Sequence, residues 1–277
     1  MRAILAASLM IAGFVTGCGH GDRRLDELRV APLHTLTERE LDQYLSWYAT
    51  LETHLPSRVV QLGRKSIGQR YQLFVLGEFP YELIDPDPLY NLRASDCVTF
   101  VEQTYAMALS HDWPSFFTTL QRIRYRDGVI GYETRNHFTE ADWNANNSWL
   151  FTEVTGQLAP AVSQPMKTRI DRAAFFKKAG IERNDPVQIL DGIYLPRDQI
   201  ESAMSQLHDG DVIEFVKEGG GFKSVTHLGL IAHDAHGKVT LIHSGKPAVQ
   251  ELLLTDYLIR RPAFCGIKVL RARAKPR

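Results

Sequence analysis

The residues best suited to chemistry in this sequence are one cysteine, Cys97, and two histidines far downstream, His227 and His243. Cys97 follows Ser95 and Asp96, which are both good helix N-cap residues. The small and apolar residues that follow recur at helical spacing: Val98, Val101, Tyr105, Ala108 and Leu109. Cys97 is therefore expected in the first turn of a helix, where free backbone N–H groups and the helix dipole favour the nucleophilic thiolate. The alternative is a small buried residue on a core helix.

The two histidines are expected on neighbouring strands of a hairpin, 225–232 and 239–244. The turn between them contains Gly237, which suits the left-handed position of a three-residue loop. If that loop centres on Ala235, His227 and His243 lie directly opposite each other, about 5 Å apart at Cβ. A two-residue turn would shift the register and place Ser244 opposite His227 instead.

A cysteine on a helix with a histidine held by a second polar residue is the nucleophile, base and orienting group of cysteine hydrolases. An ordinary thiol is already a few per cent ionised at neutral pH, so raising its thiolate fraction gains only about thirtyfold. Proton donation to a departing amine contributes roughly 10² to 10⁴. We therefore expect His227 to matter most as the general acid for a poor leaving group, which indicates amide cleavage, and His243 to fix its tautomer.

A metal site is the competing use of these histidines. Zinc is held by three or four convergent ligands, usually with short spacings that this sequence lacks around His227 and His243. We therefore expect neither a metal nor another cofactor.

A second candidate site is the stretch 135–144, which is unusually rich in recognition groups for a loop: Arg135, His137, Glu140, Asp142 and Trp143. His137 is expected to hold a carboxylate and Trp143 to stack on a sugar face. The alternative is that His137 and Trp143 fix this loop to the core.

The composition limits the class of partner. The chain has 277 residues, 44% of them hydrophobic and 23% charged, with a formal net charge of zero. That is enough apolar material for a sizeable core, and a pI near 7.2 gives no indication of a nucleic-acid partner.

The N-terminus has the features of a lipoprotein signal. Arg2 precedes an apolar stretch, 3–14, that is too short to span a bilayer. Residues 15–18 resemble a bacterial lipobox, which implies a signal peptide of residues 1–17, lipidation of Cys18 and a polar tether over 18–36. Gly19 after the cysteine favours the outer membrane and a periplasmic location. The alternative is an ordinary secretory signal.

An exported protein can also form disulfides, so a bridge between Cys97 and Cys265 is a structural alternative for both thiols. Cys265 lies in an apolar run, 263–267, that instead indicates a buried strand residue.

The remaining pattern predicts helices first and antiparallel strands last, an α+β fold in a single domain over 37–277. A capping box begins at Thr37. Further helices are expected over 56–68, 97–109, 115–125, 167–180 and 196–207, and strands over 212–216, 225–232, 239–244 and 267–270. Gly219–Gly221 is expected at a hairpin tip.

Two motifs in this frame, 96–102 around Cys97 and 226–230 around His227, resemble the signatures of NlpC-type, papain-like cell-wall cysteine hydrolases. The chain is most similar to their N-acetylmuramoyl-L-alanine amidase-like branch. Further matching stretches are 68–71, 135–138, 142–143, 207–211, 241–244 and 266–270. The resemblance runs from about residue 60 to 271.

The resemblance implies a papain-like core in which the nucleophile helix packs on an antiparallel sheet, with additional N-terminal helices. It implies hydrolysis of the amide between N-acetylmuramic acid and L-alanine, in peptidoglycan or its turnover fragments. Cys97 would be the nucleophile, His227 the base and acid, and His243 the orienting residue.

The resemblance also places Tyr71 near the oxyanion, with Asp96 and Arg135 beside the substrate. Arg70 stands where the branch tends to have proline, and Phe138 where tyrosine is usual. Two other functions are compatible with the same residues: an endopeptidase that cuts the γ-D-glutamyl bond of the stem peptide, and a non-catalytic lipoprotein that binds wall fragments.

Overall fold

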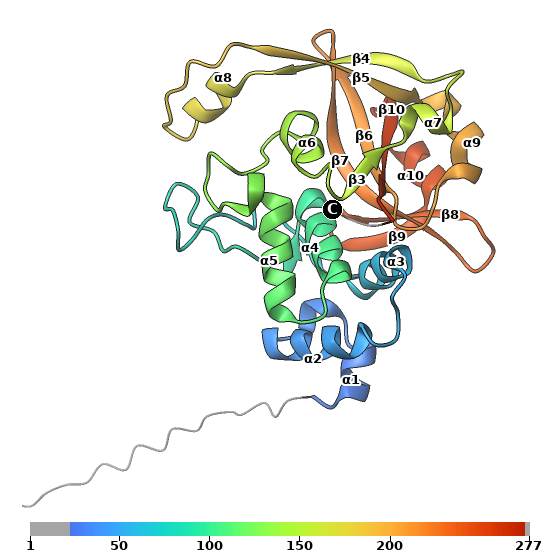
Figure 1. The fold of residues 1–277 in the computed structure, drawn as a ribbon. Coiled ribbons are helices and arrows are strands. Elements are labelled where there is room, and N and C mark those ends of the chain that lie inside the picture. Colours follow the sequence, from blue (N-terminus) through green and yellow to red (C-terminus); the bar gives the residue numbers. More distant parts are fainter. Residues whose placement is uncertain (1–22, 275–277) are drawn as a thin grey trace, which may run out of the picture.

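A computed structural model describes residues 23–274 of the chain. Its centre is an eight-stranded sheet with antiparallel pairing throughout, in the order β4-β5-β10-β6-β7-β8-β9, with β3 also pairing with β10 (Figure 1). The strands are β3 (Phe151–Glu153), β4 (Gln164–Ile170), β5 (Gln188–Pro196), β6 (Val212–Gly219), β7 (Phe222–His233), β8 (Val239–Ser244), β9 (Val249–Leu253) and β10 (Gly266–Ala272). The predicted Cys18 lipidation site and signal peptide lie outside the described residues.

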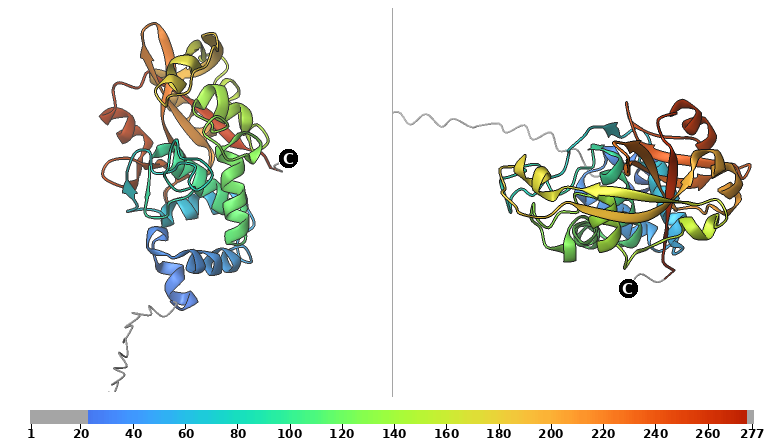
Figure 2. Two further views of the ribbon diagram at one scale, coloured as in Figure 1. Left: turned by 90° about the vertical axis from the view of Figure 1, so that its left-hand side faces the viewer. Right: turned by 90° about the horizontal axis from the view of Figure 1, so that it is seen from above.

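Helices α1 to α5 gather at one end of this sheet, with α2 and α1 furthest from it (Figures 1 and 2). The longer helices are α2 (Glu38–Tyr48), α3 (Leu55–Lys65), α4 (Cys97–Leu109) and α5 (Trp113–Arg124). The shorter ones are α1 (Leu25–Val30), α6 (Asn144–Asn146), α7 (Thr155–Leu158), α8 (Arg172–Lys177), α9 (Ile200–Ala203) and α10 (Leu254–Arg260). Among residues 23–274, no helix is both long and apolar enough to cross a bilayer.

Side-chain caps start the helices where the sequence predicts them. Thr37 and Glu40 form a capping box at α2, and Asp96 and Thr99 form another at α4. Each box satisfies two backbone N–H groups that would otherwise lack partners. The beginning of α4 is therefore fixed locally, by the residue that precedes Cys97.

The sheet separates two apolar cores. On one side α3 and α4 contact the sheet, and α2 and α5 complete the core in which Phe100, Val101 and Tyr105 of α4 are buried. The other side packs against α7, α9 and α10 and includes Phe215 and Tyr257. Helix α4 is buried along most of its length, from Thr99 to Ala108. The predicted α+β class, with α4 on an antiparallel sheet, is confirmed.

Two parts of the prediction were wrong, and a third, the helix over 196–207, is present as consecutive short turns. Residues 23–36, expected as a polar tether, form α1 and a 3₁₀ turn that bury Leu28, Leu33 and Leu36. The helix expected over 167–180 begins as strand β4, in which buried and exposed residues alternate, and only Arg172–Lys177 is helical. The segment 196–207 contains three short helical turns.

The strands β3, β5 and β9 were not predicted. Every residue of the edge strand β4 pairs with a residue of β5, so the two strands stabilise each other. The expected hairpin tip at Gly219–Gly221 is confirmed, because Gly220 and Gly221 both have positive φ between β6 and β7.

Candidate active site

Cys97 is the first residue of α4, and its sulfur lies against β7, the strand that carries His227. The backbone N–H of Leu228 in β7 donates a hydrogen bond to the Cys97 thiol. Leu228 directly follows His227, so the structure brings the helix start and the histidine strand together. The Asp96 side chain caps the helix by accepting from the Thr99 N–H at 2.9 Å.

The two histidines meet on one face of the sheet, but in a different register from the one expected. The hairpin loop centres on His236, with Gly237 at φ +74°, and the backbone N–H of Asp234 donates to Lys238 O at 2.9 Å. Ile242 consequently pairs with Leu230, which leaves His243 diagonal to His227 instead of directly opposite. Diagonal neighbours share a face, and their long side chains still meet.

The ring nitrogens define how the pair is oriented. His227 Nε2 lies 2.9 Å from His243 Nδ1, and the ring planes are nearly perpendicular. If His227 Nε2–H donates this bond, its Nδ1 keeps a free lone pair, and His243 carries its own proton on Nε2. His243 is only 1% exposed, and its Nε2 has no partner among the described residues. The pair therefore leaves His227 Nδ1 as the nitrogen able to exchange a proton with a thiol.

Ser244, the alternative orienting residue, has a different task. Its hydroxyl donates to the backbone carbonyl of Ser95 at 2.9 Å and accepts from the Ser95 hydroxyl at 3.0 Å. Ser95 lies in the two-residue strand β2 (Ala94–Ser95), which pairs with β1 (Arg70–Tyr71). Ser244 thus joins β8 to the segment that leads into α4, while His243 contacts His227.

Burial decides the charge of the resting site. Burial and, to a smaller extent, the nearby Asp96 raise the pKa of the Cys97 thiol to about 12. Burial, together with neighbouring positive charge, lowers the pKa of His227 to about 3 and that of His243 to about 4. The expected helix-stabilised thiolate is therefore not the resting form: at neutral pH, desolvation outweighs the helix start, and the site holds a neutral thiol and neutral imidazoles.

Two tyrosines border the thiol, one predicted and one missed. Tyr71 in β1 has a raised pKa because of burial and the nearby Cys97. Tyr257 of α10 packs 4.7 Å from the His243 ring and 5.9 Å from the His227 ring, measured between centroids. Burial raises its pKa to about 12, with Cys97 among the causes. Nothing local in the sequence distinguishes Tyr257 from an ordinary core position of an amphipathic helix.

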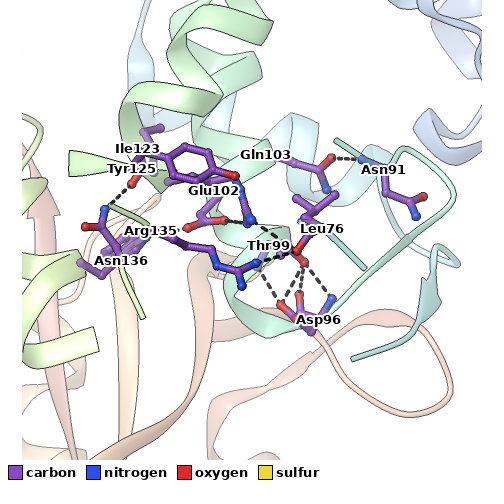
Figure 3. A network of polar contacts seen from close by, with 12 residues as sticks. Leu76, Asn91, Asp96, Thr99, Glu102, Gln103, Ile123, Tyr125, Arg135 and Asn136 are labelled. Carbon is purple, nitrogen blue, oxygen red and sulfur yellow. Dashed lines mark hydrogen bonds and ion pairs between the residues drawn. The ribbon is translucent and has the colours of Figure 1, made fainter. Parts of the chain in front are cut away.

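A cavity of about 520 Å³ opens beside Cys97, lined by its neighbours Asp96 and Val98 and by Arg135. Arg135 donates to Leu76 O at 3.0 Å (Figure 3). It also forms an ion pair with Asp85 at 2.8 Å. Of the predicted substrate-binding residues, Tyr71 and Asp96 flank the thiol, while Arg135 lies on the wall of this cavity.

His137 also lines the cavity, but its ring is already engaged. Its Nε2 lies 2.6 Å from Tyr132 O, and its ring packs against Tyr132, Phe175 and Phe176. Burial, followed by the Arg135 charge, lowers its pKa to about 4. A neutral imidazole that donates to a backbone carbonyl has no second N–H for a substrate carboxylate, so the expected carboxylate contact does not fit this geometry.

The prediction that Trp143 stacks on a sugar was wrong. Trp143 is 1% exposed, stacks on Phe151 at 5.3 Å and donates from Nε1 to the buried Glu102 at 3.0 Å. The stretch around it is not a loop, because Thr139–Trp143 forms a π-helical turn that continues into α6. The turn directs the indole into the core.

The described part of the chain contains no group of three or more His, Cys, Asp and Glu side chains arranged to hold a metal ion. Cys97 and Cys265 are both free thiols. Cys265 packs instead with Met166, Tyr194 and Val216.

Several solved structures are similar to this chain in their overall fold. Protein LPG0564 from Legionella pneumophila is 22% identical, with a TM-score of 0.76 over 87% of this chain and 95% of that chain, which shows a shared fold. An N-acetylmuramoyl-L-alanine amidase from Bacteroides uniformis is 25% identical, with a TM-score of 0.65 over 80% of this chain and 100% of that chain. No curated protein matches the sequence.

A family model described as AmiA-like, N-acetylmuramoyl-L-alanine amidase-like, matches residues 61–267. This range includes Cys97, His227 and His243 and spans more than half of the chain. The chain therefore belongs to the AmiA-like family and is an amidase-like hydrolase.

Proposed function

We propose that this protein is a cysteine amidase that hydrolyses the bond between N-acetylmuramic acid and L-alanine in peptidoglycan or its turnover fragments. The observation that carries the proposal is the 2.9 Å contact between His227 Nε2 and His243 Nδ1, one residue away from the Leu228 N–H that meets the Cys97 sulfur. Membership of a family of peptidoglycan amidase-like proteins supplies the substrate class.

The reaction begins with Cys97 as a neutral thiol and His227 as a neutral imidazole. His227 Nδ1 accepts the thiol proton as the Cys97 sulfur attacks the amide carbon, and the carbonyl electron pair moves to oxygen. His243 accepts the His227 Nε2–H and stabilises the imidazolium. Tyr71 lies beside the developing oxyanion. The C–N bond then breaks as the imidazolium gives its proton to the departing amine of L-alanine, leaving a thioester on Cys97.

Water completes the cycle. His227 takes a proton from water as its oxygen attacks the thioester carbon, and the C–S bond breaks to release the muramic acid carboxyl group. The sulfur recovers the proton from His227, so the resting thiol and neutral imidazole return. The lowered pKa of His227 suits the first step, because the imidazole is unprotonated at neutral pH and its lone pair is available.

The proposal also covers the fold family to which the protein belongs and its location in the cell. A cysteine at the start of α4, packed against β7 and β8, supports a papain-like core of the NlpC type. Lipidation of Cys18 would anchor the enzyme on the periplasmic side of the outer membrane. Metabolic palmitate labelling tests the anchor: the label should be lost in Cys18→Ser, and unchanged membrane partitioning of that variant would refute it.

Mass spectrometry of muropeptides after incubation with the enzyme tests the reaction. We expect peptides that begin with L-alanine and intact muramic acid sugars. Cys97→Ala should abolish this release, whereas Cys265→Ala is the matched control and should retain it. Muramoyl products that keep L-alanine and D-glutamate would instead identify the γ-D-glutamyl endopeptidase, and no cleavage with folded wild-type protein would reject both.

A further inference from the structure

The loop before the nucleophile helix exposes an unusual set of large apolar side chains. They are Leu73, Phe74, Phe79, Tyr81, Leu83 and Ile84, all within a single segment. Phe74 is 78% exposed and has a φ of +54°, in the left-handed region that a non-glycine residue rarely adopts. An exposed aromatic ring and a strained backbone both oppose folding, and such residues cluster at functional sites.

This loop is held in place. The backbone N–H of Gly77 donates to Pro88 O at 3.0 Å, and that of Glu78 donates to Asp85 O at 2.9 Å. The Asp85 carboxylate is in turn paired with Arg135 at 2.8 Å. Phe74 is therefore presented by a braced loop.

Phe74 lines the cavity beside Cys97 together with Ile84 from the same loop, and Tyr132 and Phe175 also line it. Phe175 of α8 is supported by the His137 and Phe138 rings at 4.7 and 5.1 Å. The cavity therefore has an aromatic lining, to which Thr99 and Glu102 of α4 and Arg124 of α5 add polar groups.

Charge decides which part of the substrate suits this cavity. Its charged lining is balanced between three acids and three bases: Asp85, Asp96, Glu102, Arg124, Arg135 and Lys178. Both arginines are already paired, Arg124 with Glu102 at 2.9 Å and Arg135 with Asp85. Lys178 is the one cation of this lining without an ion pair among the described residues, and it is exposed, so an acidic stem peptide would find only a solvent-exposed partner here.

An uncharged sugar fits better. The apolar face of a pyranose ring packs on an aromatic side chain, and its hydroxyl and acetamido groups need hydrogen bonds. Arg124 is 4% exposed, lines the cavity, and its Nε has no hydrogen-bond partner among the described residues. It provides a buried donor of the kind that an acetyl carbonyl or hydroxyl accepts from.

We infer that the Phe74 cavity is the subsite for the N-acetylated sugar on the acyl side of the scissile amide, with Phe74 as its stacking platform. This inference rests on the proposed amidase function for its substrate. It assigns Phe74, which neither sequence motif contains, as a residue that determines specificity for a sugar-bearing substrate.

Two substrates with the same scissile amide provide the test. One is N-acetylmuramoyl-L-alanyl-γ-D-glutamate, and the other is D-lactyl-L-alanyl-γ-D-glutamate, which lacks the sugar. We expect Phe74→Ala to lower the ratio of kcat/KM for the first over the second by about tenfold, through KM, the size expected for one lost aromatic contact. Phe74→Tyr should restore the ratio.

Leu83→Ala is the matched control, because Leu83 is 77% exposed on the same loop but does not line the cavity. It should leave the ratio unchanged. An unchanged ratio in Phe74→Ala, or an equal fall in Leu83→Ala, would overturn the inference.

A binding measurement separates this inference from the proposed reaction. The probes are N-acetylmuramic acid methylamide and the dipeptide L-alanyl-γ-D-glutamate, titrated into full-length Cys97→Ala and followed by ligand-observed NMR. We expect the sugar probe to bind and to weaken about tenfold when Phe74→Ala is added. Phe74-dependent binding of the dipeptide alone would assign the cavity to the stem peptide, and sugar binding without wild-type turnover would reject the reaction but keep the subsite.

Discussion

Gly245 lies directly against the imidazole of His243: a Cβ at position 245 would come within 2.6 Å of His243 Cε1 and 3.0 Å of Nδ1. That Nδ1 is the atom that meets His227 Nε2. Because position 245 has no side chain, the His243 ring can occupy the position in which it contacts His227.

Gly245→Ala should impair catalysis more than folding. Displacing the His243 ring lengthens its bond to His227, so we expect kcat to fall by at least about tenfold, as misplacement of a group by about 1 Å can cost up to a hundredfold. Gly219→Ala is the control, since a Cβ there meets nothing within 4 Å. Wild-type kcat in a folded Gly245→Ala protein would contradict the orienting role of His243.

The resting thiol should behave as a protonated group. Because burial raises the pKa of Cys97 to about 12, alkylation of native protein by iodoacetamide should accelerate continuously from pH 7 to pH 10. A preformed thiolate–imidazolium pair would instead give a rate that is already level near neutrality. Peptide mass spectrometry reports Cys97 and Cys265 separately, and a level profile for Cys97 would contradict the neutral resting state.

Acid should destabilise the fold through its buried histidines. The pKa values of His227, His243 and His137 are lowered to about 3, 4 and 4, below the ordinary value of about 6.5 in an unfolded chain. Between these values the unfolded state binds more protons, so stability present above pH 6.5 is lost as the pH falls toward 4.

Thermal unfolding from pH 7 to pH 4 measures this effect, and the melting temperature should fall throughout. His137→Gln removes one titrating group and should make that fall shallower, even if its melting temperature at pH 7 is lower. An unchanged slope in His137→Gln would show that His137 is not the buried neutral group described here.

Trp143 should prove to be a stability residue. Trp143→Phe keeps an aromatic ring on Phe151 but removes the N–H that donates to Glu102, leaving a buried acceptor with one fewer partner. We expect a loss of about 1–3 kcal/mol in unfolding free energy, with kcat/KM per folded molecule retained. Denaturant unfolding and muropeptide turnover on the same sample decide this, and a stable variant with a raised KM would restore the sugar-stacking hypothesis.

The chain by itself determined what depends on near neighbours. The capping boxes at Thr37 and Asp96 fixed two helix starts, and the second of these placed Cys97 in a first turn. The period-two strands around His227 and His243 indicated a shared hairpin, and Gly237 indicated its turn. Caps, turns and alternation act over a few residues, so their physical causes can be read from local sequence.

Only the tertiary structure decided the register of the histidine hairpin, the protonation state of Cys97 and the residues that line the cavity. The sequence allowed a three-residue loop centred on Ala235 or a two-residue turn, whereas the structure has the loop centred on His236. The thiol lost its expected charge because burial outweighed the helix start. Trp143 turned inward while Tyr257 and Phe74, distant in sequence from the histidine motif, came to border the thiol and the cavity. Desolvation and long-range contacts arise only when the whole chain is packed, so no local sequence pattern predicts them.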